Sequence, residues 1–165
     1  SAFVRRAAGS NRSIVRAPVG GDSAEPGDRT LTDAALSLQA GARVFRTGGG
    51  IGRLGLQPAA HGGALRSAVF TPCPHNDFNG AGLLYFANFQ ALADRAELAW
   101  HGLRPALTVE RELYFYGNID PGESVRAELL AEREDGDEYA HWIRLSRCAD
   151  GVRIADALTR KRRVA

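Results

Sequence analysis

The chain has 165 residues, of which 44% are hydrophobic and 24% are charged, and its formal net charge is +2. This length fits one domain with or without an attached segment, and so small a net charge gives no indication of a nucleic-acid partner. No apolar run approaches the ~18 residues of a membrane-spanning helix. We therefore expect a cytoplasmic protein that binds neither nucleic acid nor a membrane.

Cysteine and histidine usage gives no metal signature. Cys73 and Cys148 are too few and too far apart for a disulfide framework or a zinc site. His61, His101 and His141 are scattered along the chain. We therefore expect no metal site and no permanently bound cofactor.

The first part of the chain carries weak structural signals. Residues 1–19 contain a short apolar and basic segment, which predicts one strand or two short ones. Residues 20–66 begin with turn-forming residues and continue with glycine-rich sequence, so we expect a linker and an irregular connection. Within this region residues 31–40 predict a short helix, and residues 41–66 show no sustained period.

The patterns strengthen from residue 67 onward. Ser67 to Thr71 is strand-like, and a polar turn follows over residues 72–82. Apolar residues then recur at spacings of three and four, which predicts a helix over Leu83 to Trp100. Gly102 and Pro105 are expected to end this helix.

Four strands are predicted after the helix, and Asp135-Gly136-Asp137 indicates a hairpin between the second and the third. The predicted strands are Leu107 to Gly117, Val125 to Ala131, Tyr139 to Cys148 and Val152 to Val164. Several of them alternate apolar and polar residues, as half-buried strands do. We expect these strands to follow one another in antiparallel order. The fold class is therefore α+β, with a curved antiparallel sheet wrapped round one long helix.

The turn before the helix is the segment most informative about function. Gly80 and Gly82 allow backbone N–H groups to approach a ligand, and the start of a helix directs N–H groups at negative charge. Such donors suit a carbonyl oxygen that becomes negative during acyl chemistry. The predicted substrate-binding residues are Gly80, Gly82, Leu83, Tyr85, Phe86 and Asn118, and the predicted catalytic residues are Asn79, His75 and Asp77. In these roles His75 would transfer protons, and Asp77 would orient His75 or Asn79.

The sequence Gly-Leu-Leu-Tyr-Phe-Ala-Asn-Phe at residues 82–89, followed by Asp94-Arg95-Ala96, resembles the hot-dog fold thioesterases of the 4-hydroxybenzoyl-CoA type. Those enzymes carry an acidic residue three positions before the equivalent of Gly82, where this chain has Asn79. A carboxylate can attack a thioester or activate water, whereas an amide can only donate or accept hydrogen bonds. The resemblance therefore implies a site that binds an acyl thioester without the usual hydrolytic group.

The longer stretch from Pro74 to Phe86 resembles the double hot-dog acyltransferase/decarboxylases of polyketide biosynthesis, of the leinamycin-pathway type. The segment over residues 116–120 and the basic ending over residues 159–163 also fit the second half of that family. The resemblance implies transfer of methylmalonyl from coenzyme A to an acyl carrier protein, with decarboxylation to propionyl. It implies three partners, namely acyl-CoA, an acyl carrier protein and a second hot-dog domain, and it implies coenzyme A and phosphopantetheine thioesters as substrates.

The same resemblance implies a domain organisation. Residues 67–165 would form a hot-dog domain, and residues 1–19 would be the closing strand region of a preceding hot-dog domain or an N-terminal extension. Because the chain begins Ser-Ala without methionine, we expect the natural chain to begin further upstream. The second hot-dog domain would belong to the same polypeptide, to a separate chain or to a second copy in a homodimer.

Two other functional readings stay open. One is a hot-dog thioesterase or dehydratase-like enzyme that uses Asp77 or His75. The other is a non-catalytic hot-dog half that completes the pocket of a partner.

Each residue singled out also has a plain structural alternative. Asn79 and the glycines around it could simply cap the helix, and Tyr85 could be a core or interface aromatic residue. Asn118 could have only a structural role in its turn. The basic residues Arg160 to Arg163 could form a solvated strand edge instead of a docking site for phosphates or an acidic carrier protein.

Overall fold

A computed structural model of the protein describes residues 4–7, 10–16, 33–47, 52, 54–58 and 62–164. The elements in chain order are β1 (Val4–Ala7), β2 (Ser10–Arg16), α1 (Asp33–Arg46), β3 (Arg66–Phe70), α2 (Phe86–His101), β4 (Ala106–Phe115), β5 (Val125–Asp135), β6 (Glu138–Arg147) and β7 (Arg153–Arg163). The five strands predicted from residue 67 onward are therefore confirmed, with small differences at their ends.

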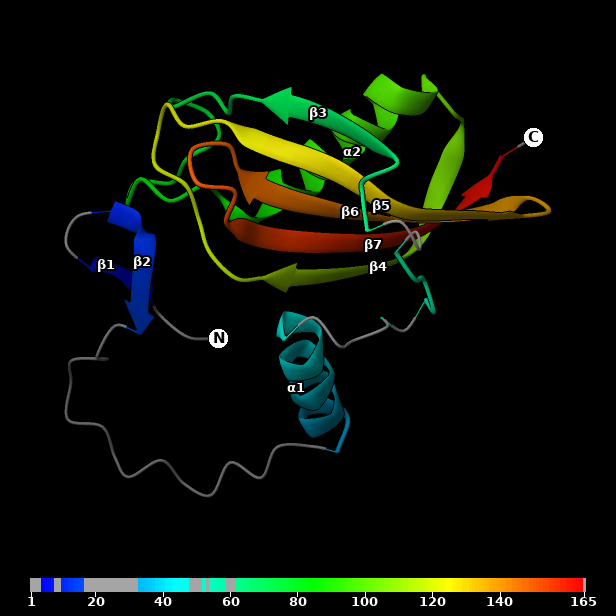
Figure 1. The fold of residues 1–165 in the computed structure, drawn as a ribbon, viewed down its shortest axis with the longest axis horizontal. Coiled ribbons are helices and arrows are strands. Elements are labelled where there is room, and N and C mark those ends of the chain that lie inside the picture. Colours follow the sequence, from blue (N-terminus) through cyan, green and yellow to red (C-terminus); the bar gives the residue numbers. More distant parts are fainter. Residues whose placement is uncertain are drawn as a thin grey trace.

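Strands β3 to β7 form one antiparallel sheet in the order β3-β5-β6-β7-β4 (Figure 1). Strand β4 pairs with β7 at the edge of the sheet and does not pair with β5, so the expected simple succession of four strands is wrong for β4. The segment over residues 116–124 consequently joins two separated strands instead of forming a hairpin turn. This crossing brings residues 116–120 beside the start of α2, where they matter for the site.

Helix α2 lies against one face of the sheet, behind the strands in Figure 1. Its buried apolar residues Phe89, Leu92, Ala93 and Ala96 recur at spacings of one, three and four and pack on apolar residues of β5, β6 and β7. At its end, the N–H of Gly102 donates to Leu98 O at 2.9 Å. A curved antiparallel sheet round one long helix is the hot-dog fold, and the expected α+β class is confirmed.

The helix begins at Phe86, three residues later than predicted. The reason is a non-local contact, because Leu84 forms an isolated antiparallel bridge with Phe78 and donates its N–H to Asn118 Oδ1 at 2.8 Å. These bonds hold Leu83 and Leu84 outside the helix. The apolar run is therefore continuous in the sequence but divided in the structure.

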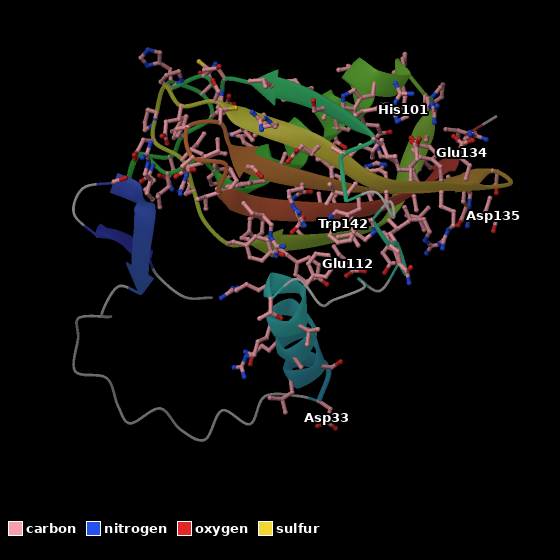
Figure 2. All side chains as sticks on the ribbon, viewed as in Figure 1. Asp33, His101, Glu112, Glu134, Asp135 and Trp142 are labelled. Carbon is pink, nitrogen blue, oxygen red and sulfur yellow. The ribbon has the colours of Figure 1, made fainter. Side chains whose placement is uncertain are left out.

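Helix α1 packs on the opposite face of the sheet. Phe45 near its end stacks on Tyr114 with ring centroids 4.3 Å apart and contacts Trp142 at 4.9 Å. Trp142 and Ile143 are neighbours in β6 and belong to different buried clusters, as expected for the two faces of one strand. In Figure 2, Trp142 and Glu112 lie near the end of α1 that meets the sheet, whereas Asp33 lies at its far end.

The prediction that residues 41–66 are irregular is wrong for residues 41–46, because α1 continues to Arg46. Two contacts explain the longer helix. Phe45 is 2% exposed, and the guanidinium of Arg153 donates to the carbonyl oxygens of Phe45 and Arg46 at 2.9 and 3.4 Å. A cation at the carboxyl end of a helix is favourable because of the helix dipole. Both contacts are tertiary and leave no local signal in the sequence.

Strands β1 and β2 form a separate two-stranded antiparallel hairpin. They occupy the region over residues 1–19 for which strands were predicted. That this hairpin closes a preceding hot-dog domain stays a prediction, as does the assignment of residues 20–66 as a linker outside α1. The described part of the chain contains no helix that is long and apolar enough to cross a membrane.

Candidate functional site

The loop between β3 and α2 is fixed to the first turn of the helix through Asp77. The N–H of Cys73 donates to Asp77 Oδ2 at 2.7 Å, and the N–H of Asp77 donates back to Cys73 O at 2.9 Å. The carbonyl oxygen of Asp77 accepts from Tyr85 N at 2.9 Å and from Asn88 Nδ2 at 2.8 Å. Asp77 therefore joins the loop to the helix, and it makes no hydrogen bond to His75 or Asn79 within the described chain.

Asn79 closes the turn that precedes the helix. Its Oδ1 accepts the N–H groups of Ala81 and Leu83, both at 3.0 Å, and its backbone carbonyl accepts the N–H of Gly82 at 2.7 Å. These bonds give Asn79 a structural role in the turn, but they do not cap the helix, which begins later at Phe86. They also leave Nδ2 as the side-chain group without a hydrogen bond among the described residues. The amide can therefore only donate to a ligand in this conformation.

That backbone N–H groups near Gly82 hold the substrate carbonyl stays a prediction, and the N–H of Gly82 itself is occupied by Asn79 O. Unpaired donors are found further along, at the first residues of α2. Tyr85 at the N-cap has extended φ and ψ of −65° and 138° and provides no side-chain cap. The N–H groups of Phe86 and Ala87 have no intrahelical partner and bond to no other described residue. No acidic residue lies in the first turn to compensate them.

Asn118 holds the end of β4 against this loop. Its Oδ1 accepts the N–H groups of Leu84 and Ile119 at 2.8 and 2.9 Å, and its Nδ2 donates to Leu84 O at 3.1 Å. Arg147 donates to the carbonyl oxygen of Asn118 at 3.1 Å. The side chain of Asn118 is buried and its hydrogen-bonding groups serve the backbone, so it shapes the site through these bonds.

A cavity of about 320 Å³ opens beside the start of α2. Most of its lining is apolar, and the rings of Phe89 and Phe115 meet edge to face at 5.2 Å. This size and character are those of a small-molecule site with few polar groups. The lining residues are Leu84, Phe86, Phe89, Phe115, Tyr116, Gly117 and Asn118.

The cavity unites only two of the predicted site residues, Phe86 and Asn118. Leu83 is buried outside the lining, and Tyr85 is 47% exposed with its ring 4.8 Å from that of Phe86. His75 is exposed. Sequence reasoning missed Phe115, although it shares the strand parity of Leu113 and so faces the helix.

A second polar cluster lies at the other end of α2. Glu97 accepts hydrogen bonds from Tyr139 at 2.6 Å and from Lys161 at 2.5 Å, and it is 3.8 Å from His141. Burial would raise the pKa of Glu97, but the hydrogen bonds from Lys161 and Tyr139 outweigh burial and lower it. Burial lowers the pKa of His141 to about 4. This cluster holds α2 to β6 and β7.

The basic residues from Arg160 to Arg163 are already paired with carboxylates. Arg160 binds Glu110 and Glu138, Lys161 binds Glu97 and Asp94, Arg162 binds Glu138 and Arg163 binds Glu134. This pairing disfavours phosphate docking, and the run is not a strand edge either, because β7 pairs with both β6 and β4. No group of three or more His, Cys, Asp or Glu residues suited to a metal ion occurs in the part of the chain that the structure describes.

No protein-family model and no curated protein matches the chain. Solved structures share its fold. The 1,4-dihydroxy-2-naphthoyl-CoA thioesterase Slr0204 from Synechocystis matches with a TM-score of 0.51 and 16% identity, over 60% of this chain and 81% of its own. A putative acyl-CoA thioesterase from Xanthomonas campestris matches with a TM-score of 0.54 and 14% identity, over 61% of this chain and 92% of its own.

The hypothetical protein SAV2348 from Staphylococcus aureus, solved in complex with CoA, matches with a TM-score of 0.53 and 13% identity, over 58% of this chain and 67% of its own. Identities this low establish the shared hot-dog fold alone. The resemblance to the double hot-dog acyltransferase/decarboxylases stays a prediction.

Proposed function

We propose that the protein binds an acyl-CoA thioester at the start of α2 and hydrolyses it. One observation carries this proposal, namely that the unpaired N–H groups of Phe86 and Ala87 begin a helix whose first residue, Phe86, lines an apolar cavity of about 320 Å³. Unpaired N–H groups at a helix start attract a carbonyl oxygen that gains negative charge, and the cavity accommodates an apolar acyl group. Fold neighbours named as acyl-CoA thioesterases support the choice of substrate class.

In this mechanism the thioester carbonyl oxygen accepts hydrogen bonds from Phe86 and Ala87 as the tetrahedral intermediate forms. Preorganised donors of this kind are typically worth about 10²–10³ in kcat each. The amide of Asn79 is a further donor through Nδ2. In this proposal backbone groups stabilise the oxyanion, so a side-chain substitution at Phe86 would not remove their contribution.

Asp77 is our candidate for activating the attacking water. Its Oδ2 is held by the N–H of Cys73, and no described residue donates a hydrogen bond to its Oδ1. A carboxylate with one free oxygen beside a helix start can accept a proton from water. His75 is the alternative base, because it lies in the same turn and is exposed.

The test is thiol release from a panel of acyl-CoA thioesters of different acyl length. Asp77→Asn keeps an oxygen for the Cys73 N–H and should abolish release without loss of acyl-CoA binding. His75→Gln serves as the matched comparison and should retain release. If calorimetry detects no binding of any acyl-CoA and no thiol is released, the proposal fails.

A second function is favoured by one specific observation, the presence of Asn79 where related hydrolases carry an acid. We infer as the alternative that the site decarboxylates methylmalonyl thioester and transfers the product to an acyl carrier protein. The C–C bond to the carboxylate would break and release CO₂, its electron pair would form the enolate held by Phe86 and Ala87, and a proton from water would give propionyl-CoA. Attack of the carrier's phosphopantetheine thiol on this thioester would then release the coenzyme A thiol and leave propionyl on the carrier protein. Propionyl on the carrier phosphopantetheine, seen by mass spectrometry after incubation with methylmalonyl-CoA, would support this function over hydrolysis.

A second hot-dog domain is our proposed partner, either in the same polypeptide, in a separate chain or as a second copy. Strand β4 lies at the sheet edge, and its Leu107 and Val109 are 65% and 43% exposed. A long apolar edge strand is a surface that pairs with another chain. Light scattering of the purified chain should show a dimer, which Val109→Lys should weaken; a strict monomer that still binds acyl-CoA would contradict it.

A further inference from the structure

The tip of the hairpin β1–β2 is inserted between the two segments that line the cavity. Asn11 at this tip is fully buried, and its Nδ2 donates to the carbonyl oxygens of both Gly82 and Ile119. Gly82 belongs to the loop before α2, and Ile119 follows the end of β4. A single amide group therefore joins the loop before the helix to the turn after the strand.

The orientation of this amide is fixed by its partners. Two carbonyl oxygens face one end of the side chain, so that end must be the NH₂ group, because only a donor can serve two acceptors. Its other atom, Oδ1, is buried without a hydrogen bond from the described residues. Asn11 thus carries a buried unsatisfied oxygen, which is a cost that the two hydrogen bonds of Nδ2 must exceed.

Hydrogen bonds and an ion pair of the residues around Asn11 fix its position. Ser10 Oγ donates to Asp120 Oδ2 at 2.8 Å, and Asn11 N donates to Asp120 Oδ1 at 2.8 Å. Arg12 pairs with Glu123 at the surface. The hairpin is therefore held to the segment over residues 118–123 by its tip, although its strands form no ladder with the main sheet.

Few covalent and hydrogen-bonded connections separate Asn11 from the N–H groups of Phe86 and Ala87, the proposed oxyanion donors. The carbonyl of Gly82 is four residues before Phe86, and Ile119 is adjacent to Asn118, which binds both backbone groups of Leu84. A shift of either segment would move Leu84 and, with it, the start of α2. Displacements near 1 Å are enough to cost about 10²-fold in rate when they misplace a reacting group.

We propose that Asn11 is a positioning residue of the acyl-thioester site, so that the hairpin preceding the domain is needed for a correctly formed site. This inference rests on the proposed function for its kinetic readout, and its structural readout is independent of catalysis. The hairpin sets the spacing between the loop before α2 and the turn after β4. It acts through backbone carbonyls and touches no substrate.

The experiment compares Asn11→Ala, Asn11→Asp and Asn11→Ser in the full chain, with Leu103→Ala as control at an exposed position outside the cavity lining. Hydrogen exchange is followed at the amides of Gly82, Leu84 and Ile119, and kcat and KM are measured with the best acyl-CoA. We expect exchange to quicken about tenfold or more at these amides in Asn11→Ala, with a fall in kcat of about 10-fold to 100-fold and little change in KM.

Asn11→Asp tests whether Asn11 acts by donating hydrogen bonds or only by filling space. It has the same shape but turns a carboxylate oxygen toward two carbonyls, so we expect larger effects than in Asn11→Ala; Asn11→Ser keeps a small donor and should be intermediate. Equal behaviour of Asn11→Asp and wild type, or unchanged exchange at Gly82 and Ile119 in Asn11→Ala, would overturn the inference. If exchange quickens in Asn11→Ala but the wild type turns over no acyl-CoA, the proposed function is overturned and the positioning role stays intact.

Discussion

Asn118 pairs with both backbone polar groups of Leu84, accepting its N–H at 2.8 Å and donating to its carbonyl oxygen at 3.1 Å. The side-chain amide of Asn118 thus pairs with the backbone of Leu84 as the backbone of a neighbouring strand would. The arrangement stops α2 from starting at Leu83 and fixes where its unpaired N–H groups point. The side-chain amide of Asn118 therefore holds together the two segments that line the cavity, one at the start of α2 and one at the end of β4.

Replacing Asn118 by leucine should therefore destabilise the protein by about 2–4 kcal/mol, because buried backbone groups of Leu84 and Ile119 lose their partners. Chemical denaturation measures the change in the free energy of unfolding. Asn118→Asp keeps the acceptor but turns a buried carboxylate oxygen toward the carbonyl oxygen of Leu84, so it should also destabilise the protein. Equal stability of Asn118→Leu and wild type would show that water replaces the amide.

Phe86→Ala should weaken acyl-CoA binding while leaving the protein folded. Phe86 is 58% exposed, so its truncation should change the free energy of unfolding by no more than about 0.5 kcal/mol, yet it lines the cavity. Titration calorimetry with acyl-CoA measures the binding. Leu103→Ala is the matched control, since Leu103 is 87% exposed and lies outside that lining. Similar losses in both variants would argue against the cavity as the acyl site.

Asn79→Asp tests whether the amide excludes hydrolysis. The carboxylate can accept the same N–H bonds from Ala81 and Leu83, so the turn should persist, and its free oxygen can activate water. We expect thiol release from acyl-CoA to rise by about 10-fold or more if the native site favours transfer. A fall in thiol release would indicate that Asn79 Nδ2 donates to the substrate and that Asp77 already supplies the base.

Stability should fall as the pH is lowered from 6.5 toward 4. Burial lowers the pKa of His141 to about 4, so the unfolded chain binds more protons in this window and unfolding becomes easier as the pH falls. The contribution is fully present above the unfolded pKa of 6.5 and amounts to roughly 3 kcal/mol. The slope of unfolding free energy against pH should flatten in His141→Gln; an identical slope would contradict this origin.

Lys161→Met should destabilise the protein by about 3–5 kcal/mol, because it leaves the buried carboxylate of Glu97 without its cation. Glu97→Gln in the same chain should recover much of this loss, since the charge that was left unpaired is then absent. A double-mutant cycle by thermal or chemical denaturation measures the coupling. Additive effects of the two substitutions would mean that the pair is screened by water.

Much of the fold follows from local patterns in the sequence. Alternation over residues 125–131 and the period of the helical segment predicted β5 and α2, since each element buries one face. The edge position of β4 was not predictable in this way, because it depends on pairing with β7 across the chain. The end of α1 was missed for a similar reason, since Phe45 and Arg153 are 108 residues apart.

The candidate site was predictable only in part. Phe86 was predicted because it follows the polar turn at the helix entry, and Asn118 because residues 116–120 resemble the second half of the double hot-dog family. The occupied N–H of Gly82 was not foreseeable, since a glycine-rich turn does not reveal which donors its own asparagine will use. The contribution of Asn11 depends on contacts over 71 and 108 residues, which no motif in a single sequence records.

The attachment of α1 has a consequence for how the molecule opens. Among the described side chains of α1, Phe45 alone is buried, and it lies on the face of the sheet away from α2. Among the described residues, α1 is held by the Phe45 ring, by the Arg153 guanidinium and by Arg46 over the Tyr116 ring. A helix with so few contacts can detach while the opposite core stays closed. The molecule should therefore have two separate levels of amide protection, with α1 exchanging through local unfolding and β6 only when the whole domain unfolds.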